Sequence, residues 1–138
     1  MIWRRWGCSA GQGTQTGSIA SIRISTGAET DTFAPQDPGA RLHLSGKAIY
    51  GIAGGLRKFD VSTGPITTQT SAPGGSGHGA CGSVWFSPDG TRIYTGCANI
   101  FRSSTDSSLD MTYVTSLAGL SGVTHLVDSA GAKRIAAI

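Results

Sequence analysis

Short apolar runs, separated by turn residues, divide most of the chain into segments of strand length. The clearest run is V-W-F at 84–86, and the turn P-D-G-T at 88–91 separates it from the apolar-Tyr segment at 92–96. An Asp-Gly pair supplies the positive-φ positions of a tight hairpin. No stretch of useful length has apolar residues at the spacing of an amphipathic helix. The pattern therefore predicts an all-β chain of short antiparallel strands.

Two sequence elements recur at a spacing of roughly 37 to 44 residues, which is typical of repeats with four strands each. The first element is I-R-I-S-T-G at 22–27, with copies F-D-V-S-T-G at 59–64 and, more loosely, F-R-S-S-T-D at 101–106. The second is L-H-L-S-G-K-A-I-Y-G at 42–51, with copies V-W-F-S-P-D-G-T-R-I-Y-T-G at 84–96 and L-V-D-S-A-G-A-K-R-I at 126–135. We therefore expect a series of similar four-stranded units.

The repeat also predicts where each unit begins and ends. The segment 1–17 is expected to be a partial strand or disordered, and the units follow at 18–34, 42–70, 83–116 and 124–138. The expected strands of the two complete units are 42–44, 48–52, 56–61, 65–70, 83–87, 92–96, 100–104 and 111–116. The first unit shows only its third and fourth strands, at 18–25 and 30–34, and the last unit stops after its second strand.

The hairpin around Asp89-Gly90 predicts a sheet that is covered on both faces. If this pair is the centre of the turn, Phe86 faces Ile93 on one side of the sheet, and Trp85 lies on the other. A sheet with one face in water would instead carry polar residues at alternate positions. We therefore expect each sheet to be stacked between two others. A sandwich strand with an incidental exposed Trp is the alternative.

The segments S-P-D-G-T-R-I-Y at 87–94 and F-D-V-S-T-G at 59–64 resemble the YVTN-type β-propeller repeat. That family pairs an S-P-D-G turn and an apolar-Tyr strand with a following apolar-Asp-x-x-Thr-Gly strand end. The resemblance covers residues 18–138. It implies a β-propeller of four-stranded antiparallel blades, of the kind found in prokaryotic surface and secreted proteins.

The expected fold is therefore all-β, a β-propeller fragment of about three blades, whereas complete propellers typically have about four to eight. We expect a fragment. The alternatives are a degenerate gene product and a protomer that completes its ring by self-association. The expected partners are the remaining blades or further copies of the chain, with a protein or a carbohydrate as ligand.

Composition narrows the classes of function. Charged residues are only 14% of the chain, and the net charge of +3 is scattered rather than clustered, so we expect no nucleic-acid surface. No stretch approaches the ~20 apolar residues of a membrane helix, and we expect no membrane span. The polar segment 7–18 that follows the basic start is not a signal sequence. Either the chain is soluble where it is made or its true N-terminus is missing.

In a propeller, the connections between strands two and three and between successive blades share the face at the mouth of the axial channel, where binding sites are expected by analogy. Here these connections are 35–41, 53–55, 72–82, 96–99 and 118–124. Their candidate binding residues are Asp37, Arg41, His78 and Asn99. A solvated His in a flexible loop is the alternative interpretation of His78.

The sequence predicts no catalytic residue, no metal site and no cofactor. The three histidines have no regular spacing and no Cys-x-x-Cys partner, and we expect His43 and His125 to be packing residues. Asp60 is expected to cap the end of a strand, and Asp89 is expected to be part of the turn at 88–91. Asp128 is expected to open the turn of the last hairpin. An enzyme complete within this chain is therefore not expected.

Two cysteines are candidates for a disulfide. In the hairpin register, Cys81 lies one step from facing Cys97, and a single bulge beside Gly79 or Gly82 would bring them together. Two buried, unpaired thiols are the alternative. Cys8 has no evident partner. A bridge would imply an oxidising compartment, and we expect an extracytoplasmic location, secreted or at the cell surface.

Two functional hypotheses follow. The first is a non-catalytic propeller segment that acts as a scaffold or binding platform in a secreted or surface-attached prokaryotic protein. The alternative is a fragment of a propeller enzyme, a lactonase-like hydrolase or a quinoprotein-type oxidoreductase, whose site needs blades outside this sequence. For that alternative, Asn99 and Asp37 are the supporting residues.

Overall fold

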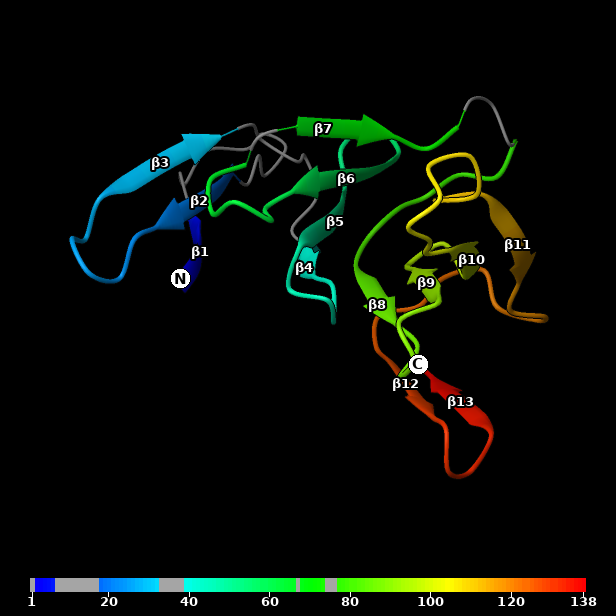
Figure 1. Cartoon of the computed structure of the whole chain (residues 1–138). Coiled ribbons are helices and arrows are strands. Elements are labelled where there is room, and N and C mark those ends of the chain that lie inside the picture. Colours follow the sequence, from blue (N-terminus) through cyan, green and yellow to red (C-terminus); the bar gives the residue numbers. More distant parts are fainter. Residues whose placement is uncertain (1, 7–17, 33–38, 67, 74–76) are drawn as a thin grey trace, which may run out of the picture.

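Every regular element that the structure describes is a β-strand. The computed structural model describes residues 2–6, 18–32, 39–66, 68–73 and 77–138. Within these ranges there is no helix, and the strands form antiparallel sheets (Figure 1). The prediction of an all-β chain is confirmed.

The strands group into sheets in the order of the sequence. The first sheet has the order β1-β2-β3, with strands Ile2–Trp6, Ser18–Ile22 and Glu29–Thr32. The second has the order β4-β5-β6-β7, with strands Arg41–Leu42, Ala48–Ile52, Leu56–Asp60 and Thr68–Ser71. The third has the order β8-β9-β10-β11, with strands Val84–Phe86, Arg92–Thr95, Asn99–Arg102 and Tyr113–Ser116. The hairpin β12-β13, Leu126–Ser129 and Arg134–Ala137, forms the last sheet.

The hairpin β8-β9 has the register that its turn predicted. Trp85 lies opposite Tyr94, and Phe86 lies opposite Ile93. The Asp89 carboxylate accepts hydrogen bonds from the Ser87 hydroxyl at 2.6 Å and from the Thr91 backbone amide at 3.0 Å, so the side chain of the turn residue closes the loop. Gly90 has a φ of 72°, a conformation that L side chains rarely adopt. The turn chemistry alone was sufficient to place these strands.

The first sheet differs from the expectation in two ways. Strand β1 pairs with β2, so residues 2–6 form a strand, whereas 7–17 lie outside the described residues. Strand β2 ends at Ile22 rather than at residue 25, because the chain turns there: the amide of Gly27 donates to the carbonyl of Arg23 at 2.7 Å. Strand β3 covers 29–32, and residues 33 and 34 of the expected strand lie outside the described residues.

Both four-stranded sheets bury side chains on both faces. On β5, Ile49 packs with Phe59 toward the first sheet, whereas the neighbouring Tyr50 packs with Phe101 of the third sheet. The third sheet repeats this arrangement, because its Tyr94 packs on the other face, against β12-β13. Successive residues of a strand point to opposite faces, so one strand serves two interfaces. The expectation of sheets stacked between two others is confirmed for these two.

The second and third sheets approach each other just before their first strands. Gly39 forms a parallel bridge with Ser83, and the amide of Val84 donates to the carbonyl of Gly39 at 3.2 Å. A Cβ on Gly39 would collide with the backbone of Ser83, so only glycine permits this approach. Figure 1 shows β4 and β8 near each other, whereas β7 and β11 lie far apart. In the described part of the chain, the sheets form an open row and are not closed into a ring.

Candidate functional site

The connection between β7 and β8 carries His78, one of the four predicted binding residues. His78 is exposed, and its ring stacks on that of Tyr113, with 3.5 Å between the ring centroids and 5° between the ring planes. It lines a groove of about 360 Å³, together with Leu56, Arg57 and Phe101. The structure thus places His78 beside Gly54 and Gly55 of the connection between β5 and β6, in contact with an aromatic ring.

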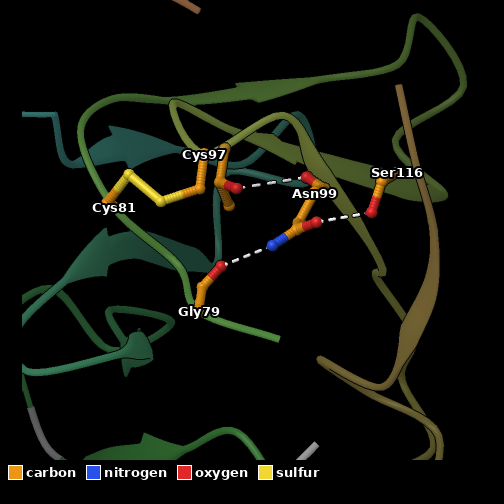
Figure 2. Close-up of a disulfide and its surroundings, with 6 residues drawn as sticks. Gly79, Cys81, Cys97, Asn99 and Ser116 are labelled. Carbon is orange, nitrogen blue, oxygen red and sulfur yellow. Dashed lines mark hydrogen bonds between the residues drawn. A yellow bond between two sulfur atoms is a disulfide. The ribbon is translucent and has the colours of Figure 1, made fainter. Parts of the chain in front are cut away.

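Asn99, at the start of β10, has both ends of its amide engaged inside the protein. Its Nδ2 donates to the carbonyl of Gly79 at 2.7 Å, and its Oδ1 accepts from the hydroxyl of Ser116 at 2.6 Å (Figure 2). These bonds join the connection before β8 to strands β10 and β11. Asn99 is therefore a structural brace between three segments.

The other two predicted residues do not join this group. Arg41, on β4, is exposed and holds its guanidinium over the ring of Trp85, 5.8 Å from the ring centroid. Asp37 lies outside the described residues. Of the four predicted binding residues, the structure brings together His78 and Asn99, which meet at the segment 77–79.

Cys81 and Cys97 form the predicted disulfide beside this segment (Figure 2). Their Cα atoms are 5.2 Å apart, within the range that a disulfide spans. The irregularity that brings them together lies at Gly82, where φ is 68°, and at Ala98, where φ is 61°. The pairing of β8 with β9 has no register shift, so the two cysteines meet beyond the ends of these strands, beside two residues with left-handed backbone. Cys8 lies outside the described residues.

A second and larger groove, of about 920 Å³, lies between the second and third sheets. Side chains of β5, β6 and β7 line one wall, and the connection from β10 to β11 lines the other. The sequence analysis did not identify this groove, because its walls come from two different repeats. It contains a group of polar side chains that the predicted site lacks.

Asp110 is the centre of that group. Its carboxylate is 4% exposed and accepts hydrogen bonds from the Tyr50 hydroxyl, at 3.1 and 3.2 Å to its two oxygens. It also accepts from the Lys58 ammonium at 2.6 Å and from the Ser104 amide at 2.9 Å. A buried carboxylate is stable only when its oxygens are paired in this way. The network therefore ties the second sheet to the third.

The protonation states in this network follow from the same contacts. Burial raises the pKa of Tyr50, and the hydrogen bond with Ser103 offsets this only in part. Burial by itself would lower the pKa of Lys58, but hydrogen bonds to Asp110 and Tyr50 raise it above its usual value. At neutral pH the groove therefore holds a neutral phenol and a protonated amine. Neither group is prepared to act as a general base or a nucleophile.

Of the two histidines expected to be packing residues, His43 is partly buried and His125 is exposed. His43 packs edge-on against Tyr50 and Phe86, with ring centroids at 5.8 and 5.1 Å, and its Nε2 lies 2.9 Å from the carbonyl of Gly90. The prediction of a packing residue is confirmed for His43. It is wrong for His125, which is exposed because it precedes β12 at the edge of a two-stranded sheet.

Asp60 has the predicted role, since its carboxylate accepts from the amide of Ser62 at 2.8 Å. Asp128 does not open a turn. It lies within β12, opposite Ile135, and accepts a hydrogen bond from the Tyr94 hydroxyl at 2.6 Å. Ser129, the last residue of β12, has the predicted role instead, and its hydroxyl oxygen accepts from the amide of Ala132 in the turn at 3.2 Å. The prediction was wrong by one position, because the last hairpin lacks an Asp-Gly pair to set its register.

One signal in the sequence points to the inter-sheet network. Lys58 lies on the same face of β6 as the buried Leu56, two positions away. In a sheet expected to be covered on both faces, a charge on that face needs a partner. The sequence does not identify that partner, because Asp110 is separated from Lys58 by 52 positions.

Among the described residues, no group of three or more His, Cys, Asp or Glu side chains is arranged to hold a metal ion. None of the elements described is a helix long and apolar enough to cross a membrane. No protein-family model, curated protein or solved structure matches the chain.

Proposed function

We propose that the chain is a segment of a β-propeller that acts as a non-catalytic scaffold or binding platform in a secreted or surface-attached prokaryotic protein. One observation carries the proposal. Each four-stranded sheet is a simple meander with buried side chains on both faces, and consecutive sheets stack face to face. Blades of a propeller have this arrangement, since every blade is covered by two neighbours.

Two further features support the propeller arrangement. The first strands of the second and third sheets approach each other in parallel at Gly39 and Ser83, as innermost strands around an axis would. The segments 59–64 and 87–94, which resemble YVTN-type repeats, cover the end of β6 and the β8-β9 hairpin. We infer that further sheets, in a longer chain or in other copies, complete the ring.

The polar groups of the described residues support binding rather than catalysis. Asn99, a residue that favoured the propeller-enzyme alternative, uses both ends of its amide on Gly79 and Ser116. The strongest cluster of ionisable groups holds Lys58 protonated and paired with Asp110. Neither arrangement offers the activated nucleophile or base that hydrolysis requires. The disulfide supports the location, because such bonds persist mainly in oxidising compartments.

The stacking can be tested by hydrogen exchange of the full chain followed by mass spectrometry. Strand β5 is buried along its whole length, whereas β7 is exposed along its whole length. If the sheets stack in solution, the amides of β5 and β9 exchange far more slowly than those of β7. Equal exchange in β5 and β7 would contradict the proposal.

The biological assignment is tested by sequencing the DNA on both sides of the coding region. Further repeats with the same two elements, together with an export signal or adhesive neighbours, would support a surface-attached platform. Inward-facing acidic and Asn residues recurring in several such repeats would instead indicate a propeller enzyme and overturn the non-catalytic assignment.

A further inference from the structure

The larger groove between the second and third sheets has a rim of side-chain hydroxyl groups that form no hydrogen bond with the described part of the protein. Thr68 and Thr70 on β7 line one side, and Thr105 and Ser107 line the other. These four residues are exposed. Within the described residues, none of their hydroxyls takes part in a hydrogen bond, in contrast to the hydroxyls of Ser103 and Tyr50 deeper in the groove. The rim is thus free to bind a partner that offers both donors and acceptors.

The charges of the groove balance. Its lining contains two lysines, Lys47 and Lys58, and two aspartates, Asp60 and Asp110. Lys58 is already paired with Asp110 at 2.6 Å. A multiply charged anion would meet the aspartates and a cation would meet the lysines, so neither gains a net attraction. The lining favours a neutral, polar ligand.

Two kinds of neutral polar ligand, a peptide strand and a polyhydroxylated molecule, would approach β7 from different directions. A peptide that extends a sheet must reach the backbone groups at a strand edge, which lie in the plane of the sheet. The groove instead lies over the face of the second sheet, where Thr70 and Lys58 pair across β7 and β6 and both line it. Its lining is therefore rich in side-chain hydroxyls of the sheet face, which suits a polyhydroxylated ligand better than a peptide strand.

We propose that this groove binds a neutral oligosaccharide, an inference that rests on the proposed role as a binding platform. The Ser and Thr hydroxyls of the rim exchange hydrogen bonds with the sugar hydroxyls. The ammonium of Lys58, whose side chain is 28% exposed, has three N–H donors and directs one to Asp110, which leaves donors for a ligand oxygen. Ala48 and Met111 provide an apolar floor for the sugar C–H groups. The volume, about 920 Å³, is sufficient for a small-molecule ligand.

The test is an array of neutral and sialylated glycans probed with the full chain, followed by calorimetric titration with soluble cellohexaose, maltoheptaose and chitohexaose. The double variant Thr68→Val, Thr70→Val removes two rim hydroxyls while keeping β-branched side chains of similar size. Thr115→Val, on the exposed part of β11, is the matched control. We expect neutral glycans to bind, the double variant to bind about tenfold more weakly, and the control to bind as the parent does.

Binding of sialylated glycans alone, capture of peptides from a random peptide library in preference to glycans, or the same affinity in parent and double variant would each overturn the proposal. No binding at all would overturn it as well. Hydrogen exchange of the same samples separates this failure from a failure of the proposed function. Slow exchange in β5 without glycan binding leaves a scaffold of stacked sheets that lacks this site, whereas fast exchange in β5 means that the sheets themselves do not stack.

Discussion

At the scale of single residues, the contacts between sheets depend on a small number of paired polar groups within apolar surroundings. Tyr50 and Tyr94 occupy equivalent positions in successive repeats, and each donates its hydroxyl to an aspartate of the next sheet. The acceptors differ, because Asp110 precedes β11 whereas Asp128 lies in β12. The donor therefore recurs from one repeat to the next, whereas the position of the acceptor differs between the two neighbouring sheets.

Asp110→Asn should lower the free energy of unfolding by about 1–3 kcal/mol, because the amide removes the negative charge that pairs with Lys58 and replaces one of the two acceptor oxygens with a donor. Urea denaturation of the full chain measures the change. Asp106→Asn, in the exposed part of the same connection, is the control and should have a smaller effect. Equal losses in the two variants would show that the network does not hold the sheets together.

The lowered pKa of the Asp89 carboxylate, in the β8-β9 turn, predicts that the stability of the protein decreases in acid. Hydrogen bonds from Ser87 and Thr91 lower its pKa from 3.8 to about 2. Since the folded protein binds this proton less readily than the unfolded chain does, the stabilisation is complete above pH 4 and is lost as the pH falls toward 2. The melting temperature of Asp89→Asn should therefore fall less steeply than that of the parent between pH 4 and pH 2. Parallel curves would contradict the assignment.

At the scale of elements, the alternation of side chains along each strand determines how the sheets stack. Strand β5 has no exposed face, because Ile49 points toward the first sheet and Tyr50 and Ile52 point toward the third. The outer strand β7 is exposed at every position. The inner strands therefore provide most of the apolar burial, and the outer strand is free to contribute the wall of a groove.

The disulfide links the connection that precedes β8 to the segment that follows β9. Its cysteines are 16 positions apart, and closing a loop of that length stabilises a protein by about 3 kcal/mol. In a Cys8→Ser background, reduction should therefore shift the urea midpoint downward by a corresponding amount. Reagents for free thiols should detect none in the unfolded, non-reduced Cys8→Ser protein and two after reduction. Two reactive thiols before reduction would show that the bridge does not form.

At the scale of the whole molecule, the row of sheets leaves apolar side chains uncovered at its end. Val127, on β12, is 55% exposed and lies on the opposite face of that strand from the buried Leu126. In the proposed propeller arrangement, the next sheet would pack on this face. An uncovered apolar face of this kind favours self-association.

Val127→Glu should accordingly reduce the concentration-dependent association of the chain, as measured by light scattering after size-exclusion chromatography. Thr115→Glu introduces the same charge on the exposed part of β11 and should leave the association unchanged. A parent chain that is monomeric at every concentration, or a Val127→Glu variant that associates as the parent does, would show that this face is not an interface.

Structural features that depend on residues close together in the sequence could be predicted, whereas those that depend on distant residues could not. The register of β8-β9 was predictable, because an Asp-Gly turn and alternating apolar residues act within a dozen positions. The same reasoning failed by one position at Asp128, where no such turn residue constrains the pairing. For the candidate site, the sequence indicated the surroundings of His78, but it assigned Asn99 to ligand binding although the folded chain uses its amide as a brace.

The amino-acid sequence by itself determined that this protein is built from short antiparallel strands in repeated units, where the β8-β9 turn lies, that the inner strands bury side chains on both faces, and which two cysteines can join. These properties depend on neighbours along the chain. Only the tertiary structure decided that Lys58 pairs with Asp110, that the second and third sheets approach at Gly39, and that a polar groove opens between β7 and the connection from β10 to β11. Such contacts join residues of different repeats, and their geometry depends on how the sheets pack, which no local pattern encodes.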